Sequence, residues 1–319
     1  MYTLLDTHSR KKAFRQCVKT TEEWLFDDAK QAVLKQIHAE ALQKFSNGDT
    51  SSLDLDLVLY ADVLMAKSAY QIYVKQDFAA GMHYLQGAYR YKLLAHRFLL
   101  ANEPRRKSRY RGYIGIFNQL VENLTFALFY TDQTAMLMLS EYANGINMCE
   151  SIDLVDMPNA DFIRHLAKLF LKRPVDTKTL PQTIHGHIIR TWNNHQQSQN
   201  IHALLDYHLA VATRMTGFDI LHKKHYPDFY YSPGFDMAHR MLLPLEVMAM
   251  YSLRKLIGLP VNDKIDHPLF PNGFWHNISA EMKQTYSDDF IKQAEAFLPP
   301  LSDVINKPIK CMPSAAFTN

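Results

Sequence analysis

The 319-residue sequence predicts an all-α fold, a multi-helix bundle of antiparallel helical hairpins with about ten helices. Glycine is scarce, at 11 residues, whereas residues that favour helices, such as Leu, Ala, Met, Lys and Gln, are common. Apolar residues recur three or four positions apart along several long segments, as they do on one face of a helix. No segment has the period-two pattern that predicts a half-buried strand.

The first helix is expected over residues 20–45, because Thr20 and Glu23 have the spacing of a capping box. The sequence Ser-Asn-Gly-Asp at 46–49 is expected to end it. A second helix is predicted over residues 54–74. Its apolar side chains recur at helical spacing in one stripe, which consists of Val58, Ala61, Met65, Ala69 and Ile72.

A third helix is expected to begin after Asp77, whose side chain is placed to cap it. Its stripe alternates large and small residues, namely Tyr84, Ala88, Tyr91, Ala95 and Phe98. Because this alternation lets two helices approach closely, the second and third helices are expected to pack as an antiparallel hairpin.

Seven more helices are expected along the rest of the chain. Gly145 and Gly258 stand where glycines commonly end helices. Residues 1–319 are interpreted as one domain of two loosely separated halves, 1–145 and 158–300, followed by an extended, proline-punctuated tail over 301–319. The helices are predicted near residues 114–130, 133–143, 160–171, 182–192, 201–223, 243–257 and 287–297.

Composition and charge place the chain among ordinary globular proteins. The net charge of +3 is too small to indicate a nucleic-acid or membrane partner. Cys17, Cys149 and Cys311 are widely spaced and form no CxxC motif, which is typical of thiols in a reducing compartment. There is neither a secretory signal nor an apolar run of the ~20 residues that a membrane span needs. A cytoplasmic location is therefore expected.

The histidine-rich segment from Thr183 to His208 suggests a metal site, but its spacing does not favour one. His202 and Asp206 are four residues apart and share a helix face, whereas His185 and His187 diverge. The sequence contains no HExxH motif and no Glu-x-x-His pair of the di-iron bundles. We expect neither a metal nor a cofactor. A metal-dependent helical hydrolase that uses His202 and Asp206 remains the alternative.

No catalytic signature is readable, since GxSxG, Walker and GxGxxG motifs are all absent. Glu246 lies in the apolar run MLLPLEVMAMYSL, so we expect it to be buried and paired. A structural ion pair with Arg214, His239 or Arg240 is favoured over a catalytic acid, because no second carboxylate lies nearby in the sequence. The chain is therefore not expected to be an enzyme.

Two segments are candidates for contact with a partner. The loop from His225 to Asp236 is rich in aromatic residues, of which Tyr230, Tyr231 and Phe235 are candidate contacts, as rigid rings are common at interfaces. A basic run contributes Arg105, Arg106 and Arg109, and continues to Arg111 with Tyr110 and Tyr113 interleaved. A lid folded onto the core and a solvated connection are the alternative interpretations of these two segments.

Residues 242–275, LLPLEVMAMYSLRKLIGLPVNDKIDHPLFPNGFW, resemble the C-terminal part of all-helical immunity proteins from bacterial polymorphic toxin and type VI secretion systems. The shared features are an apolar helix begun by Leu-Leu-Pro, a Leu-Gly-Leu exit and an acidic loop. The pattern is most similar to immunity protein family forty-nine, and next to the helical immunity proteins that oppose PoNe-type DNase toxins. Residues 203–214 and an early hairpin over 60–91 carry the same likeness, which covers about a third of the chain.

The resemblance implies an antitoxin that binds a cognate secreted toxin effector and occludes its active site, with no catalysis of its own. Beyond the aromatic loop and the basic run, the candidate contacts are Trp275 and His276, after the late helix, and an acidic loop with Asp54 and Asp56. The aromatic loop has no counterpart in the family, and the slightly basic charge does not suit an inhibitor of a basic nuclease. The oligomeric state is left open.

A third class of protein is a peptide-binding adaptor built from helical hairpins. Such an adaptor would present a groove lined by Tyr84 and Tyr91. A single hairpin is, however, too few for a solenoid of stacked repeats.

Overall fold

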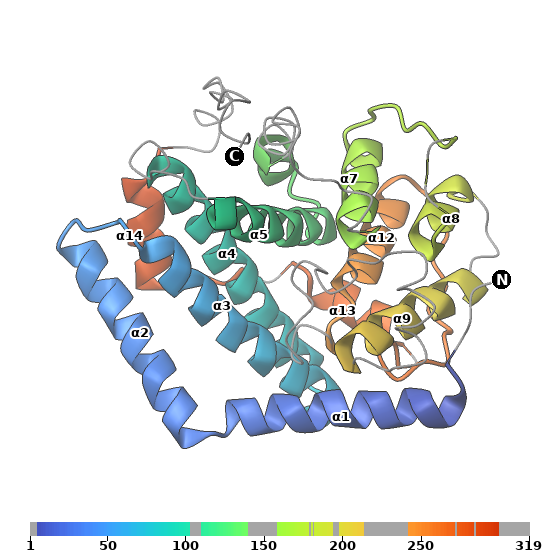
Figure 1. The fold of residues 1–319 in the computed structure, drawn as a ribbon, viewed down its shortest axis with the longest axis horizontal. Coiled ribbons are helices and arrows are strands. Elements are labelled where there is room, and N and C mark those ends of the chain that lie inside the picture. Colours follow the sequence, from blue (N-terminus) through green and yellow to red (C-terminus); the bar gives the residue numbers. More distant parts are fainter. Residues whose placement is uncertain are drawn as a thin grey trace.

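The computed structural model describes the fold of most of the chain, and the ribbon is shown in Figure 1. Within the described residues there are eleven labelled α-helices, one further helical stretch, one π-helix and no strand, so the predicted all-α fold is confirmed. The described residues are 5–102, 110–139, 158–178, 180, 182–193, 198–213, 242–271, 273–283 and 285–299.

The helices vary from long rods to short turns, and a further helical stretch occupies residues 133–139. The bounds of the labelled elements are α1 Thr7–Leu25, α2 Asp28–Ser46, α3 Leu53–Tyr70, η1 Gln71–Lys75, α4 Phe78–Asn102, α5 Tyr110–Phe129, α7 Pro158–Phe170, α8 Ile184–Arg190, α9 Ser198–Thr213, α12 Leu245–Leu256, α13 Phe274–Glu281 and α14 Asp289–Phe297.

The N-terminal helices do not start where the sequence pattern predicted. Helix α1 is capped by Asp6, whose carboxylate accepts a hydrogen bond from the Ser9 N–H at 2.8 Å. Thr20 lies inside this helix, so the predicted start there is wrong. A second cap at Asp27 begins α2 after a sharp corner, because Asp27 accepts from the Lys30 N–H at 3.0 Å. The N-caps are therefore Asp6 and Asp27, one on each side of the predicted cap at Thr20. The predicted single helix corresponds to the end of α1 and the whole of α2.

The predicted hairpin is confirmed as α3 packed against α4. The last turn of the predicted second helix winds more widely, as the π-helix η1. Asp77 caps α4 as expected, accepting from the Ala80 N–H at 3.0 Å. On α4, a Cβ added at Gly87 would lie 3.0 Å from the Tyr286 ring and 3.1 Å from Leu64. A glycine there permits close approach of α3 and of the segment before α14.

Helix α12 ends as the sequence predicted. Gly258 has a φ of +77°, and its N–H donates to the Lys255 carbonyl at 3.2 Å. The Leu259 N–H reaches back to the Arg254 carbonyl at 2.8 Å, which completes a Schellman motif. Helix α13 is an addition that the sequence pattern did not predict. Its first N–H groups are capped by Asp263, which accepts from Trp275 at 2.8 Å and His276 at 3.1 Å.

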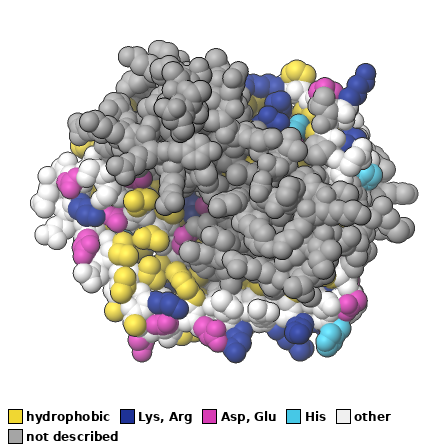
Figure 2. Space-filling view, viewed as in Figure 1, with side chains coloured by type: hydrophobic (Ala, Val, Ile, Leu, Met, Phe, Trp, Pro, Cys, Tyr) yellow, Lys and Arg dark blue, Asp and Glu magenta, His cyan; other side chains and the backbone are white. Residues whose placement is uncertain are grey.

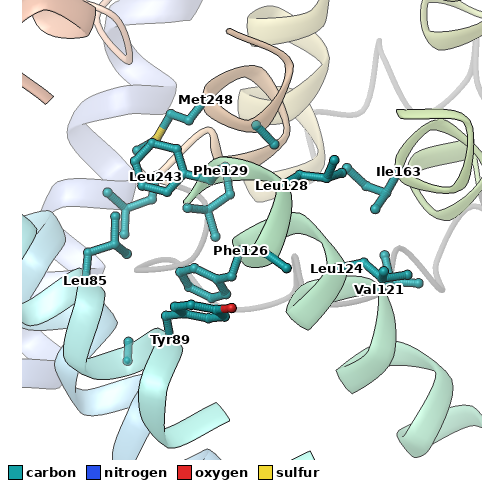
Figure 3. Close-up of a cluster of buried hydrophobic side chains, with 14 of the residues drawn as sticks. Leu85, Tyr89, Val121, Leu124, Phe126, Leu128, Phe129, Ile163, Leu243 and Met248 are labelled. Carbon is teal, nitrogen blue, oxygen red and sulfur yellow. The ribbon is translucent and has the colours of Figure 1, made fainter. Parts of the chain in front are cut away.

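One hydrophobic cluster runs through both halves of the chain. Helix α5 contacts α4, α7 and α12, and so joins the N-terminal hairpin to the later helices. On α4 and α5, the rings of Tyr89 and Phe126 stack with centroids 5.7 Å apart. Figure 3 shows this part of the core, with Leu85, Tyr89, Val121, Leu124, Phe126, Leu128, Phe129, Ile163, Leu243 and Met248 labelled.

None of the described helices combines the length and the apolar composition needed to cross a bilayer. Helix α1 lies along one edge of the molecule, where it contacts both α3 and α9 (Figure 1). Helix α2 leaves this edge at the corner after Leu25 and packs on α3.

Candidate functional site

Several predicted partner contacts fall outside the described residues. The aromatic loop and the basic run are both in this group. The residues concerned are Tyr230, Tyr231, Phe235, Arg105, Arg106 and Arg109.

The predicted acidic loop is instead the first turn of α3. Asp54 is buried there. Asp56 binds the Lys44 ammonium of α2 at 2.8 Å, and its side chain is largely covered. Asp56 therefore serves the packing of α2 on α3, and the buried Asp54 offers no surface to a partner.

Trp275 and His276 have opposite environments on α13. Trp275 is buried, with its ring 5.4 Å from Tyr251 and 6.5 Å from Phe129. It is thus part of the core and presents no surface to a partner. His276 is exposed and remains a candidate contact.

The most elaborate polar cluster centres on Asp206 of α9, which is completely buried. The Arg10 guanidinium of α1 holds both carboxylate oxygens, with Nε 2.7 Å from one and Nη2 2.9 Å from the other. The Leu5 N–H donates to Asp206 at 3.0 Å. Since the Leu269 N–H donates to Nδ1 of His267, the proton of that ring lies on Nε2, which faces Asp206 at 3.2 Å.

These contacts determine the ionisation of the Asp206 cluster. Burial alone would raise the pKa of the Asp206 carboxyl, but the hydrogen bonds from Arg10 and His267 and the charge of Arg10 outweigh it and lower the pKa. Asp206 is thus an ionised partner of Arg10. His202, which the alternative of a metal-dependent hydrolase pairs with Asp206, has its ring 6.1 Å from that of His267. Among the residues that the structure describes, no group of three or more His, Cys, Asp and Glu is placed to hold a metal ion.

The buried histidines predict a fall in stability with acid. Burial lowers the pKa of His267 and of His96 to about 4. An unfolded histidine has a pKa of about 6.5, so the unfolded chain binds more protons between the two values. Stability is therefore complete above about pH 6.5 and decreases as the pH falls towards 4, by about 2 kcal/mol per histidine from pH 7 to 5. Urea unfolding at pH 7 and pH 5 measures this difference.

The variant His96→Gln serves as the control for this titration. It removes one titrating group, so the difference between pH 7 and pH 5 should shrink by about 2 kcal/mol whatever the absolute stability of the variant. A stability that stays constant or increases on acidification would contradict the assignment.

Two further buried polar contacts join helices. Glu246 is buried, as predicted, and its partner is His208 of α9, whose Nδ1 lies 2.5 Å from the carboxylate. The predicted partners of Glu246 lie outside the described residues. Lys92 of α4 is buried between two carboxylates, at 2.9 Å from Asp62 and 2.8 Å from Glu122. These pairs specify how α3, α4, α5, α9 and α12 pack.

The groove expected of a peptide-binding adaptor is filled by the chain itself. Tyr91 is fully buried, its hydroxyl donates to Asp288 at 2.8 Å, and Phe290 of α14 stacks on its ring with centroids 5.8 Å apart. Tyr84 is half-buried beside it. Since α14 occupies this side of α4, Tyr91 offers no surface to a peptide.

An apolar surface is left exposed on α2 and α3, and we call it the α2–α3 face. Leu55 and Leu59, one turn apart on α3, are 55% and 39% exposed, and Val33 on α2 is 55% exposed. Figure 2 shows the hydrophobic side chains that gather over these two helices. Leu55 and Leu59 lie outside the apolar stripe that the sequence assigned to this helix. Apolar residues in excess of that stripe were the one signal that could have predicted the face.

No protein-family model, curated protein or solved structure matches this chain.

Proposed function

We propose that this chain is an immunity protein, which binds a cognate secreted toxin effector in the cytoplasm and occludes its active site without catalysis of its own. The observation that carries the proposal is the α2–α3 face, where Val33 of α2 and Leu55 and Leu59 of α3 are exposed to water although the two helices pack on each other. Apolar side chains at the centre of an interface, with charged residues around them, are typical of tight protein complexes.

The free energy available from burying these side chains favours a binding role for the α2–α3 face. Burying a whole Leu or Val side chain stabilises by about 1.5–3 kcal/mol, so three half-exposed side chains could together contribute several kcal/mol to a complex. Because about 1.4 kcal/mol changes an affinity tenfold, a contribution of several kcal/mol would strengthen binding by a large factor.

The buried ionisable groups also support a binding role, because the fold itself uses them. Arg10 holds Asp206, and Lys92 joins Asp62 to Glu122. Groups that are tied to partners within the fold stabilise the shape that a partner recognises. This pairing disfavours a metal-dependent hydrolase that would use His202 and Asp206, since both oxygens of Asp206 already accept hydrogen bonds from Arg10.

Growth rescue tests the proposal. Where the neighbouring gene encodes a toxic C-terminal domain, that domain is expressed in bacterial cells with and without this chain. We expect growth to stop with the toxic domain alone and to resume when the chain is co-expressed. Failure of the chain to restore growth, or a neighbouring gene that encodes no toxic domain, would count against an immunity role.

A further inference from the structure

The exposed side of α1 carries a row of cations. Lys11, Lys12, Arg15 and Lys19 are all exposed; Arg15 follows the two adjacent lysines by three and four residues and Lys19 follows Arg15 by four, so the cations lie on one side of the helix. The opposite face is buried through Ala13, Cys17, Thr21 and Leu25. In Figure 2 basic side chains lie at the lower edge of the molecule, with acidic and histidine side chains among them, where Figure 1 places α1. We call this row the α1 basic edge.

The charges of α1 are arranged against the helix dipole. The first turn contains no acidic residue and the last turn contains no basic one, while Glu22 and Glu23 lie near the C-terminal end. Acids near the N-terminus and bases near the C-terminus would stabilise the helix, by about 0.3–1 kcal/mol each. Apart from the capping Asp6, α1 has the reverse order. A charge pattern that weakens its own helix is expected where the charges serve another purpose.

Helix α1 is also firmly held. Arg10 anchors it to the buried Asp206 of α9, and its buried side packs against α3 and α9. A helix of 19 residues is about 28 Å long, so the four cations project from a rod of defined geometry. A rigid support reduces the entropy lost when a partner docks.

The type of exposed side chain changes along the α1 basic edge, and this order favours a folded protein as the partner over a nucleic acid. After the cations come Glu22 and Glu23, and Lys19 lies 3.5 Å from Glu23. Phe26 follows at the corner with α2, 63% exposed and edge-on to the Tyr70 ring at 5.2 Å. A phosphate backbone is uniformly negative and would be repelled by the two glutamates. A protein surface can match all three parts in order, with an acidic patch, basic groups and an apolar pocket.

We infer that the α1 basic edge is the docking site for an acidic protein surface, with carboxylates against Lys11, Lys12, Arg15 and Lys19 and an apolar pocket over Phe26. The inference rests on the proposed function where it takes the partner to be the toxic domain. In that case, the toxic domain is expected to have an acidic surface around its active site. The slightly basic net charge of this chain then suits its partner, which would not be a basic nuclease.

Two charge-reversed variants test the inference. In the edge variant, Lys11→Glu, Lys12→Glu and Arg15→Glu are combined. In the matched control, three exposed lysines elsewhere are reversed, which changes the net charge equally: Lys178→Glu, Lys255→Glu and Lys264→Glu. The edge variant should unfold at the same temperature as wild type or higher, because its new carboxylates lie nearer the positive end of α1. The two variants therefore report on binding and not on loss of the fold.

Association is measured with the toxic domain used for growth rescue, and separately with poly-L-glutamate and a DNA duplex. With the toxic domain, we expect the edge variant to associate about tenfold more slowly than wild type and than the control at about 0.15 M salt. Equal rates for all three proteins would overturn the inference and leave the proposed function standing.

If wild type does not bind the toxic domain, the proposed function fails and poly-L-glutamate decides the inference. Binding to poly-L-glutamate that only the edge variant loses would support the docking site. Equal binding by both variants, or no binding by wild type, would overturn it. DNA bound more tightly than poly-L-glutamate, and released by the edge variant alone, would also overturn it in favour of a nucleic-acid partner.

Discussion

Replacing Leu55 and Leu59 together by glutamate is expected to weaken binding of the toxic domain about 100-fold or more. The two side chains are two of the three that define the α2–α3 face, and in a complex each glutamate would have to leave water without a partner to pair with its charge. A cost of about 1.5 kcal/mol or more at each position gives a loss of about 3 kcal/mol, which corresponds to this change in affinity. Titration calorimetry with the purified toxic domain measures the effect.

A matched control comes from two exposed apolar residues at the C-terminal end of α12. Leu256 and Ile257, which end α12, are 57% and 47% exposed, so the double change to glutamate there introduces the same chemistry. This control variant should bind like wild type. If both double variants bind like wild type, the α2–α3 face is not the interface. If only the control loses affinity, the end of α12 takes its place.

The variant Asp206→Ala is expected to lower the free energy of unfolding by about 3–5 kcal/mol. It removes the carboxylate that holds Arg10, His267 and the Leu5 N–H, and it leaves the guanidinium in a mostly buried place without its counter-charge. Urea unfolding at pH 7 measures the loss. The exposed pair of Lys292 and Asp289 supplies the control, because Asp289→Ala should change stability by less than about 0.5 kcal/mol.

A loss below about 1 kcal/mol for Asp206→Ala would show that the buried cluster does not anchor α1. The α1 basic edge depends on this anchor, because the contact between Arg10 and Asp206 helps to fix α1 on α9. The stability of the Asp206 cluster and the binding of the α1 basic edge are therefore linked, although they are measured in separate experiments.

Local signals explain which helices the sequence predicted. The α3–α4 hairpin and the end of α12 were predicted because Asp77, the apolar stripes and Gly258 all lie within a few residues of the features they specify. Helix α13 was missed because Asp263, which caps it, precedes Trp275 by 12 residues. The start at Thr20 was wrong because a capping-box spacing also occurs by chance inside a helix, and Asp6 and Asp27 provide the real caps.

The site could be predicted only in part, for a related reason. The burial of Glu246 followed from its apolar neighbours, but its partner His208 lies 38 residues away. The pairing of Arg10 with Asp206 spans 196 residues, so no local pattern could indicate it. Trp275 was taken for a contact because large aromatic residues are common at interfaces, yet the same size and apolarity place it in the core.

Neutralisation by binding differs from neutralisation by catalysis in its stoichiometry, and this difference tests the central claim most directly. The activity of a fixed amount of the toxic domain is measured while the purified chain is added in increasing amounts. We predict a linear decrease to zero at a fixed molar ratio, with an end point that does not change with incubation time. Complete inactivation by far less than an equivalent, progressing with time, would contradict the account.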